Sequence, residues 1–191
     1  DKKSLFLTRG HLVAKADLVY ASQQRSTFTF FNVAPQWQSF NSGQWQTLES
    51  KVRSFVANRK IQIKCYTGTW GIMKLANKEF YLTQDDNNNG LLPVPKLYFR
   101  VLVNESGPKG REEQGIALIG VNNPHASMED ILREYVICED VSEQLEWLKW
   151  IKNNSLKKGY MYACRVSDFA KVVEFLPQKL SRVTQLLGES E

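Results

Sequence analysis

Two segments of the chain decide its interpretation: Thr8-Arg9-Gly10-His11 (TRGH), and residues 32–53, which read NVAPQWQSFNSGQWQTLESKVR. The second segment contains the clearest helical pattern in the sequence. Its apolar residues recur with the 3.6-residue period of one helix face: Trp45, Leu48, Val52, Phe55 and Val56. We therefore predict a helix that Asn41 opens, with Ser42-Gly43 in its first turn and its end near Asn58.

The remainder reads as strands first and helices last. Aromatic, β-branched or alternating apolar stretches predict strands at 4–7, 27–33 (ended by Pro35), 60–67 (closed by Gly68), 79–83, 96–103 and 115–121. Helices are predicted from the capping residues Ser127, Ser142 and Ser167, followed by an amphipathic segment at 180–187. This order predicts an α+β fold with a central, mainly antiparallel sheet flanked by helices. Because no repeat or linker divides the chain, we expect a single domain over residues 1–191.

Bulk composition narrows the class of protein. A hydrophobic fraction of 42% with 24% charged residues is typical of a globular domain and argues against disorder. No apolar run has the length of a membrane span. The formal net charge of +5 is compatible with a polyanionic partner, although many basic proteins have none. The start at Asp1-Lys-Lys-Ser, without Met, is interpreted as the end of a processed or truncated product.

The two segments supply the groups that phosphodiester hydrolysis needs: a base, and positive charge for the developing phosphorane. His11 is the candidate general base, because an imidazole with an ordinary pKa of about 6.5 is largely neutral at physiological pH. Arg9 and Arg53 are candidate phosphate ligands. With two histidines in the chain and no CxxC spacing, a His-rich or Cys-rich zinc site is not expected.

Asn41 and Glu49 are the candidate metal residues. Mg²⁺ prefers oxygen ligands and keeps several waters, so one amide oxygen, from Asn41, can be its direct protein ligand. Glu49 follows eight residues later, about 12 Å along a straight helix, which is too far for a second direct bond to the same ion. We therefore expect Glu49 to act on the metal through a water molecule.

These residues resemble the DNA/RNA non-specific endonucleases of the ββα-metal superfamily. That family's signature is Asp-Arg-Gly-His, then Asn-(x)-x-Pro-Gln, then Asn-x-Gly-x-Trp-x-x-x-Glu, which corresponds here to residues 8–11, 32–36 and 41–49. The segments TRGHL (residues 8–12) and NVAPQWQ (residues 32–38) are most similar to those of the secreted arthropod nucleases of this family. The resemblance implies a ββα-metal nuclease core and a Mg²⁺-dependent endonuclease that cleaves DNA and RNA, with Mn²⁺ or Ca²⁺ able to substitute in binding.

The resemblance also assigns individual roles. It implies that His11 is the base, and that Asn32 and Arg53 help to orient water and phosphate. Gln36 and Trp45 are expected to contact substrate, with a pure core role left open for Trp45. The alternative function is a catalytically degenerate nucleic-acid-binding protein that keeps the cleft without turnover.

Two departures from the family pattern stand out. Thr8 replaces the usual Asp, at a position with no expected proton transfer. Family members also carry a substantial stretch before the RGH motif, so we expect an N-terminal segment to be missing, removed or present as a separate fragment of the same precursor.

The arthropod resemblance implies a secreted protein, in which disulfides are stable. Cys138 and Cys164, which bracket two predicted helices, are then the expected pair. Cys65 is expected either to bridge to the N-terminal fragment or to stay buried and free. Three reduced thiols in a cytoplasmic or mitochondrial enzyme remain the alternative.

Overall fold

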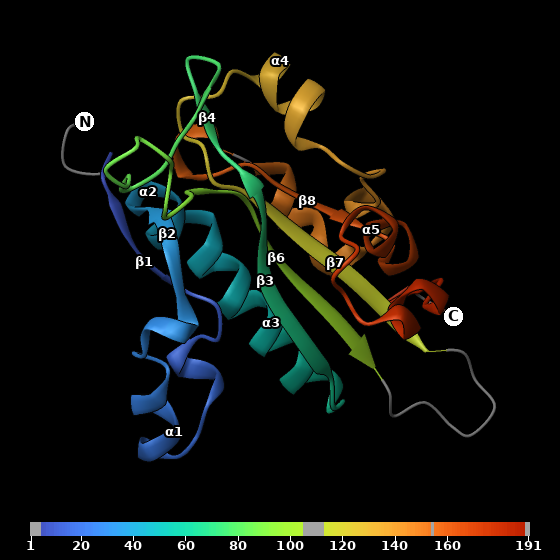
Figure 1. Cartoon of the computed structure of the whole chain (residues 1–191). Coiled ribbons are helices and arrows are strands. Elements are labelled where there is room, and N and C mark those ends of the chain that lie inside the picture. Colours follow the sequence, from blue (N-terminus) through green and yellow to red (C-terminus); the bar gives the residue numbers. More distant parts are fainter. Residues whose placement is uncertain (1–4, 105–112, 154, 190–191) are drawn as a thin grey trace.

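The central sheet divides the molecule into two layers. The computed structural model describes residues 5–104, 113–153 and 155–189. Four antiparallel strands follow the order β3-β6-β7-β8, and a short strand, β9, pairs in parallel with β7. Their bounds are β3 Lys64–Ile72, β6 Pro95–Asn104, β7 Gln114–Val121, β8 Met161–Cys164 and β9 Gln185–Leu186. Figure 1 shows helix α3 (Gln46–Arg59) on one side of this sheet and α5 (Val166–Val172) on the other. The predicted α+β class with a mainly antiparallel sheet is confirmed.

Smaller elements surround the sheet. Two two-stranded ribbons pair β1 (Leu7–His11) with β2 (Val33–Trp37), and β4 (Lys74–Leu75) with β5 (Lys78–Glu79). The short helices are α1 Ala21–Ser26, α2 Gln38–Phe40 and α4 Met128–Asp130, with π-helical turns η3 Asn41–Trp45 and η4 Ile131–Tyr135. The 3-10 turns are η1 Lys15–Asp17, η2 Phe30–Asn32, η5 Ser142–Gln144, η6 Glu146–Asn153, η7 Leu156–Lys158 and η8 Gln178–Arg182. No helix among the described residues is long and apolar enough to cross a membrane.

Strand β6 supplies the core on both faces of the sheet, because successive side chains of a strand point to opposite sides. Tyr98 and Leu102 pack in the cluster that includes α3, whereas Phe99 and Val101 pack in the cluster that includes α5. Arg100 lies between them in sequence and shares the α3 face with Tyr98 and Leu102. The same alternation that builds the core therefore places a buried arginine under helix α3.

The predicted helix is confirmed, but its beginning is different. Helical structure starts at Gln38 in α2, and Asn41 lies inside the following π-helical turn. Gly43 breaks the regular path with φ −102° and ψ −115°. A Cβ at this position would lie 2.6 Å from the backbone oxygen of Lys158, so a close backbone approach requires glycine here.

The predicted strand at 27–33 is wrong. Most of it forms the end of the α1 region and the 3-10 turn η2, and strand β2 begins only at Val33. Pro35, which was expected to end the strand, lies inside β2 opposite Arg9. Proline is compatible with an edge strand, because the missing N–H is not needed for a second neighbour. The aromatic composition misled the prediction, since β-propensity reports packing that these side chains do not make.

Other boundaries also moved. Gly68 is paired within β3 instead of closing it, and the strand expected at 79–83 reduces to β5 and an isolated bridge at Tyr81. Ser127 caps α4 in a capping box, as predicted. By contrast, Ser142 begins a 3-10 turn and Ser167 is the second residue of α5. The C-terminal segment is not one helix, because the Leu187 amide donates to the Gly115 carbonyl beside β7, which favours the extended strand β9.

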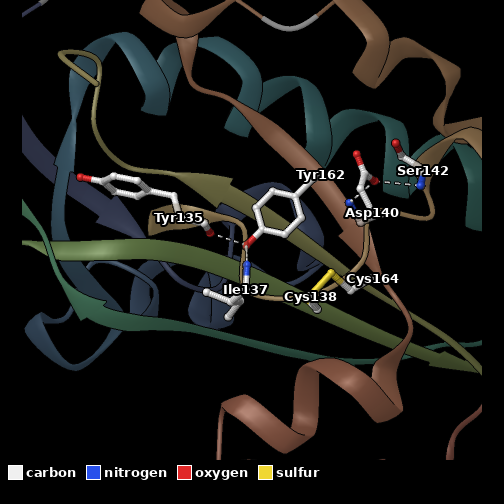
Figure 2. Close-up of a disulfide and its surroundings, with 8 residues drawn as sticks. Tyr135, Ile137, Cys138, Asp140, Ser142, Tyr162 and Cys164 are labelled. Carbon is white, nitrogen blue, oxygen red and sulfur yellow. Dashed lines mark hydrogen bonds between the residues drawn. A yellow bond between two sulfur atoms is a disulfide. The ribbon is translucent and has the colours of Figure 1, made fainter. Parts of the chain in front are cut away.

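The predicted Cys138–Cys164 disulfide is present (Figure 2). It ties the segment after η4 to strand β8. Tyr162 extends the same link, since its hydroxyl donates to the Tyr135 carbonyl at 2.7 Å. Cys65 is free and exposed near the start of edge strand β3, so the expectation that an unbridged Cys65 would be buried is wrong.

Candidate active site

The first two motif segments form one antiparallel ribbon. Strand β1 carries TRGH and pairs residue by residue with β2, with His11 opposite Val33 and Arg9 opposite Pro35. The Leu12 amide extends the ribbon by donating to the Asn32 carbonyl at 2.9 Å. Val13 and Asn32 are 19 positions apart in the sequence, and the hydrogen bond between them shows that the two segments are neighbours in space.

Buried side chains of the main sheet hold this ribbon in place. The Tyr98 hydroxyl, on β6, donates to the Ala34 carbonyl at 2.8 Å. The Asn122 amide group accepts from the Trp37 amide at 2.9 Å and donates to the Pro35 carbonyl at 3.1 Å. Asn122 is fully buried, so these bonds satisfy an otherwise costly polar group. Nothing in the local sequence around Tyr98 or Asn122 indicated this role.

Thr8 joins the ribbon to the third motif segment. Its hydroxyl donates to the Gln36 carbonyl at 3.0 Å and accepts from Nδ2 of Asn41 at 3.1 Å. Because the amide nitrogen of Asn41 is engaged in this bond, its Oδ1 is the atom left for a cation. A threonine hydroxyl can therefore do what an acidic residue at this position would do, which is to accept from the asparagine amide.

Glu49 and Arg53, on α3, face a charged cluster that the sequence did not reveal. The Asp17 carboxylate forms a salt bridge with Arg53, with Oδ1 and Nη1 3.0 Å apart, and a second salt bridge with Arg100. Arg53 thus forms its ion pair with Asp17, which is 36 residues away in the sequence, and not with Glu49 one helical turn before it. Burial raises the pKa of Glu49, a shift that the positive charge of Arg100 opposes and Asp17 reinforces.

Arg100 is the most buried charge of this cluster, with only 3% of its surface exposed. One guanidinium nitrogen pairs with Asp17, while Nε and Nη1 have no hydrogen-bond partner within the described part of the chain. The guanidinium lines a cavity of about 380 Å³ together with Arg53 and Cys65. Arg100 lies in the middle of a strongly apolar strand, so the sequence did not indicate that it belongs to the candidate site.

His11 ends β1, half-exposed. Its ring meets the edge of Phe28, with ring centroids 5.4 Å apart. Partial burial, and then the positive charge of Arg9, lower the pKa of His11 below its ordinary value. The imidazole is therefore neutral at pH 7 and able to accept a proton. Among the interactions of the described residues, none joins His11 directly to Asn41 or Glu49.

Hard-cation chemistry fits the donor set near α3. The free Oδ1 of Asn41 and the carboxylate of Glu49 are oxygen donors, the type that Mg²⁺ prefers. The described residues contain no group of three or more His, Cys, Asp or Glu side chains able to hold a metal.

Three predicted site residues lie differently from expectation. Gln36 and Trp45 are 0% and 1% exposed, so neither can contact substrate in this conformation. Trp45 packs edge-on against Phe40 and Tyr98, which makes it a core residue. The Asn32 amide is occupied by backbone groups: it accepts from the Val13 amide and donates to the Val13 and Thr27 carbonyls, each at 2.9 Å.

The family model of the DNA/RNA non-specific endonucleases matches residues 1–169. The chain belongs to this family. The match covers the β1–β2 ribbon, α3 and all four antiparallel strands of the central sheet, so the family resemblance inferred from the sequence is confirmed.

Individual relatives are more distant. The chain is 29% identical over 174 residues to the salivary endonuclease of Lutzomyia longipalpis, covering 87% of this chain and 38% of that protein. It is 22% identical over 187 residues to the salivary protein Tsal1 of Glossina morsitans morsitans, covering 94% of this chain and 43% of that protein. The chain therefore spans less than half the length of these relatives. A solved EndoG/EndoGI complex matches with a TM-score of 0.43 and 24% identity, over 64% of this chain and 50% of that one.

Proposed function

We propose that this chain is the catalytic domain of a secreted, Mg²⁺-dependent endonuclease that hydrolyses phosphodiester bonds in DNA and RNA. The main observation that supports this proposal is the hydrogen-bond network around Thr8. Together with the β1–β2 pairing, it joins the three family motifs. Family membership supports a nuclease. The Cys138–Cys164 disulfide and the salivary relatives support secretion.

His11 is the proposed general base. Because its pKa is lowered, the neutral ring is available to take a proton from the attacking water at physiological pH. The water oxygen forms the new bond to phosphorus as the bond to the leaving oxygen breaks. Arg9, exposed beside His11, is placed to bind a non-bridging phosphate oxygen.

Asn41 and Glu49 are the proposed cation-binding residues, with Asn41 Oδ1 as the direct ligand. A bound Mg²⁺ supplies positive charge that stabilises the phosphate in the transition state. Thr8 orients the Asn41 amide so that Oδ1 is presented. Arg53, which forms a salt bridge with Asp17, is the second proposed phosphate-binding residue. The buried Arg100 positions Asp17 through a second salt bridge. Asn32 acts by holding the loop after His11 instead of by touching substrate.

Cleavage of plasmid DNA and of double-stranded RNA, each with Mg²⁺ and with EDTA, tests the proposal. We expect Mg²⁺-dependent cleavage of both. His11→Ala should lose about 10²- to 10⁴-fold in turnover, the usual contribution of a general base, while nucleic-acid binding stays near normal. His125→Ala is the matched control, because His125 lies in a loop against Trp37. Binding without cleavage by the wild type would instead identify a non-catalytic nucleic-acid-binding protein.

A further inference from the structure

The segment between β1 and β2 exposes an unusual amount of aromatic surface. Phe28, Phe30 and Phe31 have exposed fractions of 59%, 82% and 99%. Figure 1 shows this excursion, which contains α1, extending beyond the ends of β1 and β2 at one end of the molecule. Phe31 makes almost no contact that could stabilise the fold, so packing does not explain it. Large exposed apolar side chains that gather in one short segment indicate an interaction surface.

We call Phe28, Phe30 and Phe31 the aromatic platform, and two of its members, Phe28 and Phe30, lie beside the candidate active site. The Phe28 ring lies against His11 with centroids 5.4 Å apart. Phe30 lines a cavity of about 490 Å³ together with Arg9 and Thr8. Phe28 therefore packs against His11, and Phe30 shares a cavity with Arg9 and Thr8, so these two rings lie beside the motif residues of β1.

Basic side chains lie close to the aromatic platform. The Lys15 ammonium lies 5.9 Å from the centroid of the Phe28 ring. Arg25, on α1, is exposed, and its carbonyl accepts from the Phe28 amide at 3.2 Å. The one acidic residue of the excursion, Asp17, is neutralised by Arg53 and Arg100. Aromatic rings among cations suit a polyanion that carries planar bases.

The platform is anchored rather than loose. The Asn32 side chain, at the end of the excursion, bonds to Val13 near its start and to Thr27 within it. The 3-10 turn η2 starts two residues before Asn32 and contains Phe30 and Phe31. A fixed turn loses little entropy when a ligand stacks on it, which favours affinity.

We propose that Phe28, Phe30 and Phe31 stack on unpaired bases of the substrate strand next to the phosphate that is cleaved. This inference rests on the proposed nuclease function and adds a substrate class: single-stranded, or locally unpaired, nucleic acid. In a duplex the base faces are covered by their neighbours, whereas an unpaired strand offers every π-face. The platform therefore gives a preference for single strands without reading sequence.

Binding in EDTA tests this without cleavage. The probes are a fluorescent oligothymidine strand and an abasic strand with the same number of phosphates, measured by anisotropy. Phe31→Ala should weaken oligothymidine binding about five-fold or more, the effect of removing one stacking ring. Binding of the abasic strand should stay unchanged, and Phe31→Trp should keep the wild-type affinity for oligothymidine. The matched control is Phe175→Ala, which removes an exposed ring beyond α5, on the other face of the sheet.

The outcomes separate the platform from the catalytic proposal. Equal weakening of both strands, or no weakening of either, would overturn stacking; concentration-dependent self-association or capture of a protein partner lost in Phe31→Ala would then assign the surface to a protein contact. Because Phe31 is 99% exposed, loss of folding does not confound the variant. If oligothymidine binding depends on Phe31 but the wild type never cleaves with Mg²⁺, the platform stands and the nuclease proposal fails.

Discussion

The Asp17–Arg100 pair gives the sharpest test of the charged cluster under α3. We expect Asp17→Asn to destabilise the protein strongly, because it removes the hydrogen-bonded countercharge of a buried guanidinium. The Arg100 side chain is 4% exposed and the Asp17 side chain 20%. Breaking such a buried pair from one side costs about 3–5 kcal/mol, and the remaining attraction from Glu49 favours the lower end. The Arg53–Asp17 pair is 37% exposed on the arginine side and adds less than about 1 kcal/mol.

Thermal and urea unfolding measure this change. For a chain of 191 residues, about 3 kcal/mol corresponds to a fall in Tm of roughly 6–12 °C. Asp168→Asn is the matched control, because the Asp168–Lys171 pair is exposed and contributes about 1 kcal/mol or less. The double variant Asp17→Asn with Arg100→Met should regain much of the lost stability, since an apolar side chain replaces the stranded charge. If Asp17→Asn were no more destabilising than Asp168→Asn, the buried-pair reasoning would be refuted.

Three further predictions concern catalysis and the disulfide. Cleavage should fall as pH drops through a midpoint below 6.5, because burial and Arg9 lower the pKa of His11 and only its neutral ring is a base; Arg9→Gln should move the midpoint upward, and a flat profile from pH 5 to 8 would contradict the assignment. Thr8→Val should raise the Mg²⁺ concentration needed for half-maximal cleavage about 2- to 12-fold, the value of one hydrogen bond, whereas Thr8→Ser should not; equal behaviour of both variants would exclude an orienting role. Replacing Cys138 and Cys164 by Ala should destabilise the protein by about 3.5 kcal/mol, from the 26-residue separation that the disulfide closes, and an unchanged midpoint in urea would argue against this chain-entropy contribution.

Local patterns determined the elements that are most regular. The apolar runs at 96–103 and 115–121 gave the central strands β6 and β7, because strands buried on both faces read as continuous hydrophobic stretches. The 3.6-residue period gave α3, and with it the placement of Glu49 and Arg53 one turn apart on the same helix. The Cys138–Cys164 pair also followed from sequence, once the family resemblance implied an oxidising compartment.

The catalytic candidates were found from the sequence because they lie in short motifs. His11, Asn41 and Glu49 occur at fixed spacing in segments that can be compared directly with a family pattern. Their surroundings could not be found in this way. Asp17 and Arg100 are 83 residues apart, and their contact depends on the side of β6 that faces α3.

Tertiary structure alone decided which aromatic and polar residues are buried. Phe31 and Trp45 are equally apolar in sequence, yet one is 99% exposed and the other 1%, because burial depends on what the ribbon and the sheet place next to each side chain. Glutamine is usually a surface residue, but Gln36 is fully buried against Gly10. A Cβ placed on Gly10 would lie only 2.6 Å from the Cβ of Gln36. Periodicity reports which face of an element is apolar; only the packing of distant elements determines whether that face meets the core, solvent or, as proposed for the aromatic platform, a ligand.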